Sequence, residues 1–155
     1  MRRRRATIRK IEADPKYGDY NLAKFINRLM WNGKKSLAQR IVYEALEDVA
    51  KRANRDGLSV FNDAVQNTTP TVEVRARRVG GSTYQVPREL RTRRQSALAH
   101  RWLIDAARAR KGRPMMEKLA QELFDASRGL GVAVKRKVDT HRMAEANRSF
   151  AQHRW

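Results

Sequence analysis

Apolar residues recur at every third or fourth position through much of the chain, which is the spacing that amphipathic helices require. The first stripe comprises Leu22, Phe25, Ile26, Leu29 and Met30. It predicts a helix that begins at Asp19 or Asn21, both good N-cap residues, and that stops at Gly33. A second stripe comprises Leu37, Ala38, Ile41, Val42, Ala45, Leu46 and Val49. It predicts a helix that ends near Asn54, and both stripes are expected to lie in the core.

After a short third helix, the apolar period changes to two. The third helix carries Leu58, Phe61, Ala64 and Val65. It should end within residues 67–70, because the residue before a proline avoids helical geometry. Apolar and charged residues then alternate on both sides of Gly80 and Gly81, which predicts a single β-hairpin over about residues 72–88. The alternation slips at Arg78 and Val79, which predicts a bulge near the turn.

Three more helices are predicted after the hairpin. Thr92 and Gln95 fit a capping box that opens a fourth helix. Its apolar side comprises Leu98, Ala99, Trp102, Leu103 and Ala106. Pro114 suits the first turn of a fifth helix that stops at Gly129. Its inner residues are Met115, Met116, Leu119, Ala120 and Leu123. A more polar sixth helix is expected from about Lys135 to Asn147, with Val138, Met143 and Ala146 as its anchors.

The predicted fold is therefore mainly α, a six-helix bundle with one projecting β-hairpin. Residues 1–19 hold seven basic and three acidic side chains and few large apolar ones, so they are expected to form a basic N-terminal arm. Residues 20–155 are expected to form a single helical domain with the hairpin and a C-terminal helix and tail.

Charge indicates a polyanionic partner. The chain has 35 Lys and Arg against 16 Asp and Glu, a net charge of +19. Self-repulsion at this charge destabilises a compact monomer, so an anion must offset it. Arginine outnumbers lysine 25 to 10, and the guanidinium both forks onto phosphate and stacks on bases. Nucleic acid is favoured over a membrane surface, and no apolar run is long enough to predict a membrane span.

Catalytic and metal-binding motifs are not found in the sequence. There is no cysteine, and His100, His141 and His153 lack close metal-ligand spacing, so neither a metal nor a cofactor is expected. Gly33-Lys34-Lys35-Ser36 resembles the end of a phosphate-binding loop, but Arg28 stands where the earlier glycine is required. The sequence predicts a cytoplasmic protein that is not an enzyme.

Several side chains have two interpretations. Lys34 and Lys35 can be solvated surface, yet cations at a positive helix N-terminus are unfavourable, so we expect a phosphate there. Tyr84 can stack on a base or brace the opposite strand. Trp155 fits either a docked terminus or a partner contact. Met115 and Met116 are expected to pack in the core. Because they come just after Arg113, a place near the ligand of Arg113 is the other interpretation.

Four ordered blocks resemble a known family. They are Gly33-Lys34-Lys35, five residues, Ile41-Val42, two residues, Ala45; the hairpin block Pro70 to Pro87; Arg93-Arg94-Gln95 with Arg101-Trp102-Leu103; and Arg142 to Arg148 with Arg154-Trp155. This series is similar to the signature of the small-subunit ribosomal protein seven family in its bacterial form. The resemblance runs from about Asp14 to Trp155.

The resemblance implies a structural protein that binds the 3′ major domain of 16S rRNA, nucleates assembly of the head and lies near the exit tRNA site. The residues that match the family's rRNA contacts are Arg3, Arg4, Arg5, Arg9, Lys10, Lys34, Lys35, Arg75, Arg77, Arg78, Arg94, Arg113, Arg136 and Lys137. The residues expected near exit-site tRNA and mRNA are Val79, Gly80, Gly81, Ser82, Thr83 and Tyr84. Contacts with ribosomal protein eleven and other head proteins are expected from Arg148, Phe150, Arg154 and Trp155.

A basic architectural DNA-binding protein is the alternative. It would share the net charge and a basic hairpin able to enter a groove, but it predicts a dimer that bends duplex DNA. The ribosomal interpretation predicts no obligate homo-oligomer and binding by shape and phosphate contacts. A protein bound to an anionic membrane is disfavoured, because no predicted helix pairs a wide apolar face with a cationic one.

Overall fold

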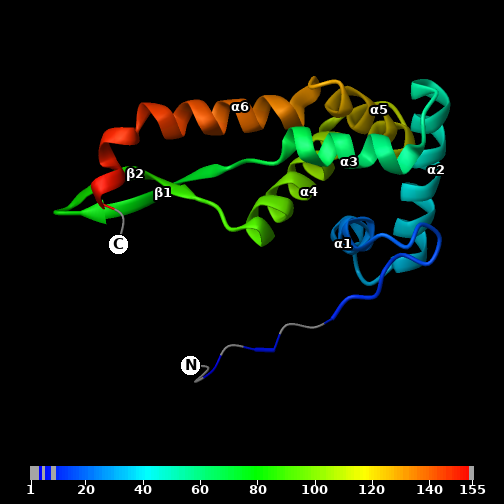
Figure 1. Cartoon of the computed structure of the whole chain (residues 1–155), viewed down its shortest axis with the longest axis horizontal. Helices are drawn as coiled ribbons and strands as arrows, with labels where there is room; N and C mark the ends of the chain where they lie inside the picture. Colours follow the sequence, from blue (N-terminus) through cyan, green and yellow to red (C-terminus); the bar gives the residue numbers. More distant parts are fainter. Residues whose placement is uncertain (1–3, 5, 8–9, 154–155) are drawn as a thin grey trace.

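The computed structural model describes residues 4, 6–7 and 10–153. In chain order its elements are α1 (Tyr20–Leu29), α2 (Lys35–Ala53), α3 (Gly57–Thr68), β1 (Val72–Val79), β2 (Ser82–Glu89), α4 (Thr92–Ala109), α5 (Met115–Ser127), α6 (Gly131–Ala146) and the 3-10 helix η1 (Arg148–His153). The six α-helices and one antiparallel hairpin confirm the predicted fold class. Figure 1 shows the hairpin extending from one end of an elongated molecule, with α2 at the other end.

Local chemistry explains where several helices begin and end. Asp19 accepts a hydrogen bond from the Leu22 amide at 2.7 Å and caps α1, and Asp56 caps α3 through the Ser59 amide at 3.0 Å. Asn54 ends α2 in the left-handed conformation, φ 50°. Of the two predicted N-caps of the first helix, Asp19 is confirmed. The predicted end of the second helix near Asn54 is also confirmed.

The core lies where α5 packs against α2, α3, α4 and α6. Another part of the core joins α1 to α3 and α4: the Phe25 ring lies 5.2 Å from the Phe61 ring and 5.5 Å from the His100 ring, each nearly edge-on. His100 is 1% exposed, and neither of its ring nitrogens has a hydrogen-bond partner within the described residues. Burial, reinforced by the charges of Arg28 and Lys24, lowers the pKa of His100 to about 4, so the imidazole is neutral at pH 7.

The hairpin is regular along its whole length. Its register pairs Val72 with Glu89 and continues without interruption to Val79 and Ser82. Gly80 and Gly81 form the turn with φ of 58° and 87°, values that favour glycine and that suit a turn following the right-handed strand twist. The predicted bulge near the turn is therefore wrong, because two glycines complete the turn without an extra residue in either strand.

The N-terminal segment is attached to α2 through Asp14. This side chain is buried and accepts hydrogen bonds from the Tyr43 hydroxyl at 2.7 Å and from the Lys16 and Tyr17 amides at 3.1 Å. Burial first, and then the hydrogen bond to Asp14, raise the pKa of Tyr43 to about 12. The packed part of the protein thus begins at Asp14, before the first helix.

Three details of the helices differ from the sequence expectation. Thr92 does not cap α4: Arg91 occupies the N-cap without a side-chain hydrogen bond, and Gln95 donates to the Leu90 carbonyl instead. Leu37 is 42% exposed although it belongs to the predicted core stripe of α2. The sixth helix begins at Gly131 and not at about Lys135.

The face that α6 presents to the body also differs from the prediction. Val138 and Met143 are about half exposed and Ala146 is exposed, so the predicted anchors are wrong. Ala133 and Ala144 are the buried residues of this helix. They are eleven positions apart, close to three helical turns, and therefore lie on one face. Small side chains on that face let α6 approach its neighbours closely.

Candidate nucleic-acid interface

The corner between α1 and α2 exposes two adjacent lysines. Asn32 and Gly33 turn the chain with φ of 50° and 72°, and Lys34 and Lys35 follow, both exposed. The first turn of α2 has no acidic residue and no side-chain cap. Within the described ranges neither lysine forms an ion pair. Positive charge therefore accumulates where the amide groups of a long helix also face outward.

The same corner borders a hollow of about 550 Å³ that reaches the start of α5. Lys34, Arg108 and Lys118 line it together with apolar side chains. The Arg108 guanidinium donates to the Leu29 carbonyl at 3.0 Å and lies 4.6 Å from the centroid of the Trp31 ring. The fold thus brings cations from three separate segments around one apolar surface.

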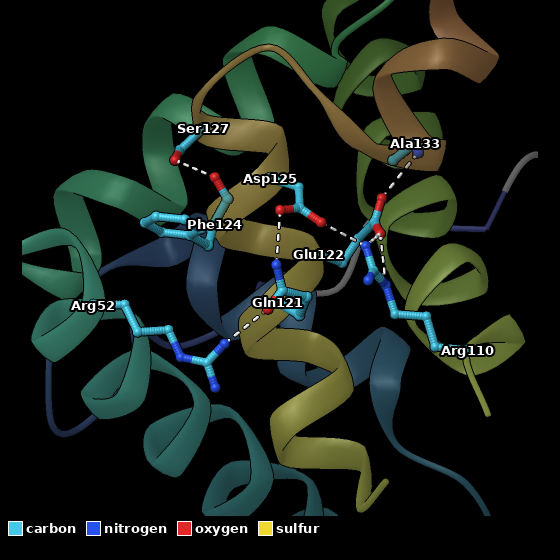
Figure 2. A network of polar contacts seen from close by, with 8 residues as sticks. All are labelled: Arg52, Arg110, Gln121, Glu122, Phe124, Asp125, Ser127 and Ala133. Carbon is cyan, nitrogen blue, oxygen red and sulfur yellow. Dashed lines mark hydrogen bonds and ion pairs between the residues drawn. The ribbon is translucent and has the colours of Figure 1, made fainter. Parts of the chain in front are cut away.

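The loop between α4 and α5 contains one cation that is paired internally. Arg110 forms ion pairs with Glu122 at 2.6 Å and Asp125 at 2.7 Å, and the fully buried Glu122 also accepts from the Ala133 amide at 3.0 Å, as Figure 2 shows. Burial opposes the charge of Arg110, but hydrogen bonds to both carboxylates outweigh it and raise the pKa of this guanidinium. Arg113, in contrast, is exposed and has no ion-pair partner among the described residues.

At the base of the hairpin, a single carboxylate pairs with two arginines that are predicted to contact rRNA. Glu73 pairs with Arg75 at 2.6 Å and with Arg94, in the first turn of α4, at 3.0 Å. The Glu73 side chain is 10% exposed, whereas the two arginines are 48% and 44% exposed. Both guanidiniums therefore have an internal partner and still reach solvent. Arg77 and Arg78, nearer the tip, are exposed.

The side chains near the hairpin tip lie beside the C-terminal segment. Gly80, Gly81, Ser82 and Thr83 are exposed. The Tyr84 ring is 5.1 Å from the ring of Phe150 in η1, so its ring contact is with this segment. Figure 1 shows how α6 runs along the hairpin before η1 turns back onto it.

Arg136 and Lys137 of α6 contact the helical body. Arg136 is 3.7 Å from Asp105 and lies over the Trp102 ring, 5.7 Å from its centroid. The Lys137 ammonium donates to the Asn67 carbonyl at 2.8 Å, at the C-terminal end of α3 where carbonyl groups lack helical partners. Each of these two predicted rRNA contacts has a structural partner in the protein itself.

The remaining predicted residues lie near the chain ends. Arg4 and Lys10 are exposed, and Arg148 is exposed in a 3.4 Å pair with Glu145. Arg3, Arg5, Arg9, Arg154 and Trp155 lie outside the described residues.

Two separate groups of predicted rRNA contacts thus stand out among the described residues, and the other predicted contacts lie apart from both. One is the α1–α2 corner, and the other is the base of the hairpin, where the strands leave the helical body (Figure 1). Trp31, Arg108 and Lys118 in the first group were missed by sequence reasoning. An aromatic residue in a glycine-bounded corner beside two lysines was the signal that could have found Trp31.

Comparison with known proteins identifies the family of this chain. The sequence model of the family described as ribosomal protein S7p/S5e matches residues 1–148. The chain belongs to this family.

Similar proteins support this membership over the full chain. Proteins named small ribosomal subunit protein uS7 from Thermotoga petrophila, Thermosipho melanesiensis and Nautilia profundicola are 57%, 56% and 54% identical to it over 155 residues, covering 100% of both chains. The S7p/S5e family consists of structural ribosomal proteins, so the predicted family and the expectation that the chain is not an enzyme are confirmed.

Two observations on the described ranges complete the site. No helix there combines the length and apolar character needed to cross a bilayer. In the same ranges, no group of three or more His, Cys, Asp or Glu side chains could hold a metal ion. For an S7p/S5e member, the chemistry that these surfaces offer is charge, hydrogen bonding and stacking.

Proposed function

We propose that this chain is a structural component of the small ribosomal subunit that binds the 3′ major domain of 16S rRNA and nucleates assembly of the head. The family match over residues 1–148 is the observation that carries this proposal. The names of the similar proteins, which place those proteins in the small subunit, support it. The ribosome-bound protein would act in the cytoplasm.

The α1–α2 corner is the part of the surface best suited to hold RNA phosphates. Lys34 and Lys35 are exposed beside the uncapped start of α2, and Arg113 is exposed in the α4–α5 loop. Because these cations have no carboxylate partner among the described residues, a phosphate meets uncompensated charge there. Such contacts fix the position of the protein on a folded RNA without reading its sequence.

The hairpin is proposed to take a second part of the same RNA at its base. Arg75 and Arg94 are held by Glu73 but remain nearly half exposed, so each can turn its outer edge toward a phosphate. The exposed tip, from Gly80 to Thr83, is proposed to approach exit-site tRNA and mRNA. The C-terminal segment, with Arg148 and Phe150, is proposed to contact ribosomal protein eleven and other head proteins.

A salt-series competition tests this function. A transcript of the 3′ major domain and a nonspecific duplex of equal length compete for the protein at several salt concentrations. We expect the transcript to bind more tightly throughout, because it offers folded shape as well as phosphates. Equal affinity for both would contradict the proposal, and a dimer that bends duplex DNA would indicate the architectural alternative.

Replacing the corner lysines measures their share of the binding. Lys34→Ala combined with Lys35→Ala should reduce the salt slope of log K by about 2 and lower affinity on the order of 10-fold at 0.1 M salt. The control is Lys51→Ala, at an exposed lysine in the last turn of α2. It should change the salt slope and the affinity only slightly. An unchanged slope in the double variant would mean that these lysines are only solvated.

A further inference from the structure

A large exposed indole beside a cationic hollow is a feature that phosphate binding leaves unexplained. Trp31 is 68% exposed, an unusual position for the largest apolar side chain. Leu37 is 42% exposed at the same place, and Ile41 and Met115 are among the other apolar residues that line the 550 Å³ hollow. Water therefore covers a continuous apolar surface at this corner.

The charges around this hollow are all positive. Lys34, Arg108 and Lys118 line it, and among its described lining residues none is acidic. A second hollow on α2, of about 460 Å³, has the opposite character: Glu44, Glu47, Asp48 and Glu117 line it beside Lys51 and Arg52. The ligand that fits the first hollow must therefore combine a flat apolar group with negative charge.

We infer that this hollow binds an unpaired nucleobase of single-stranded RNA, stacked on the Trp31 indole, with the adjoining phosphates on Lys34 and Lys118. The inference rests on the proposed RNA-binding function and adds to it the kind of nucleotide that this corner recognises. A nucleobase is flat, has an apolar face and is carried on a ribose that is linked to phosphates. A base within a duplex already stacks on its neighbours and is not accessible in this way.

Arg108 explains how the indole is held ready for the base. Its guanidinium is fixed by a hydrogen bond to the Leu29 carbonyl at the end of α1, and it lies 4.6 Å from the Trp31 ring centroid. One face of the indole is thereby covered by a planar cation, and the ring remains mostly exposed for a second planar group. This arrangement orders Trp31 before RNA binds, which lowers the entropic cost of stacking.

The test compares a short unpaired RNA oligonucleotide with a duplex of the same length. Trp31→Ala should weaken binding of the unpaired RNA by about 5-fold or more, as the loss of one stacked base does. Binding of the duplex should stay the same. Because tryptophan is uncharged, the salt slope for the unpaired RNA should not change, in contrast with the lysine variants.

Matched variants separate stacking from other effects. Trp31→Phe keeps a ring and should retain most of the affinity. Tyr20→Ala removes another exposed aromatic, 60% exposed on α1 and outside the hollow, and should have no effect. Quenching of indole emission by the unpaired RNA should be larger in the wild type than in Trp31→Phe, since Trp102 is buried and any contribution of Trp155 is common to both.

Equal affinity of the wild type and Trp31→Ala for the unpaired RNA would overturn the inference, and it would leave an acidic protein segment as the candidate occupant of the hollow. This outcome differs from a failure of the proposed function. That failure would appear as equal affinity of the wild type for the 3′ major domain and for nonspecific duplex, whatever residue 31 is.

Discussion

The helical body and the hairpin are stabilised in different ways. In the body, the side chains of Leu22, Phe25, Ile26 and Phe61 are at most 1% exposed and pack on each other. In the hairpin, Val86 is the one buried apolar residue among the described side chains. The hairpin is held instead by polar and aromatic contacts to other elements: Glu73 with Arg94, His141 with the Thr71 amide at 3.2 Å, and Tyr84 with Phe150.

This difference shows which part of the molecule can change without loss of the whole. A lone two-stranded hairpin is marginal in water, so the strands depend for their order on packing against α6 and η1 and on the ion pair between Glu73 and Arg94 of α4. The body has its own core and does not depend on the strands. We therefore expect substitutions in the body to lower global stability, and substitutions in the hairpin contacts to act locally.

The largest effect is expected from the buried carboxylate of the body. Glu122→Ala leaves the Ala133 amide without its acceptor and removes one of the two partners of Arg110. We expect a loss of about 3 kcal/mol in the free energy of unfolding, and a Tm lower by roughly 10 °C in calorimetry. Glu145→Ala, which removes an exposed pair with Arg148, is the control and should stay within about 0.5 kcal/mol.

The second effect depends on pH and comes from His100. Its folded-state pKa of about 4 lies below the ordinary 6.5, so between these values the unfolded chain binds the proton more tightly. The contribution of His100 to the free energy of unfolding is therefore fully present above pH 6.5. It is lost as the pH falls toward 4, by roughly 1.4 kcal/mol per pH unit. The free energy of unfolding, measured with urea, should fall between pH 7 and pH 5 in the wild type. In His100→Leu this fall should be about 2 kcal/mol smaller. The same loss in both proteins would show that another group is responsible.

A smaller and local effect is expected at the hairpin base. Glu73→Gln removes the charge that Arg75 and Arg94 share, at a cost of about 1 kcal/mol because both arginines are nearly half exposed. Hydrogen exchange should become faster in the strand amides and stay unchanged in α2 and α5. Faster exchange throughout the body would contradict the separation of the two regions. The salt slope for rRNA should increase, since two cations lose their internal partner.

The smallest effect is expected at the tip of the hairpin. Phe150→Ala removes the ring contact with Tyr84, which is worth about 0.5–1.5 kcal/mol. The Tm should change little, because η1 contacts β2 and α6 and not the core of the body. The measurement is hydrogen exchange of residues 82–86, which should be faster in Phe150→Ala than in the wild type. Slower exchange, or a large drop in Tm, would show that η1 does not act as a local contact.

Much of the fold could be predicted because its signals are local. The apolar period of α1, the cap at Asp19 and the two glycines of the turn each depend on residues a few positions apart. The same approach failed for α6. In a mostly polar helix, Val138 and Met143 suggested one face, but packing against neighbouring elements selected Ala133 and Ala144 on another. Close approach favoured small side chains, and the sequence contains no local signal of that distance.

The candidate site was predictable only in part, for a related reason. Composition and the family resemblance identified the basic residues of the hairpin and of the α1–α2 corner. They did not indicate which cations have internal partners, because those pairs join distant positions: Glu73 with Arg94, and Lys137 with the carbonyl of Asn67, 70 residues apart. Exposure of Trp31 likewise follows from how α1, α2, α4 and α5 are arranged around the hollow beside it.

The uninterrupted register from Val72 to Val79 restricts how this hairpin can vary in length among relatives. Adding one residue to each strand moves the tip outward by about 3.4 Å, and it also reverses which face every more distal side chain occupies. Tyr84 would then point away from Phe150. Two residues added to each strand on the base side of Tyr84 would restore its face but carry its ring about 7 Å past Phe150. Changes in length that keep this contact should therefore lie between Tyr84 and the tip.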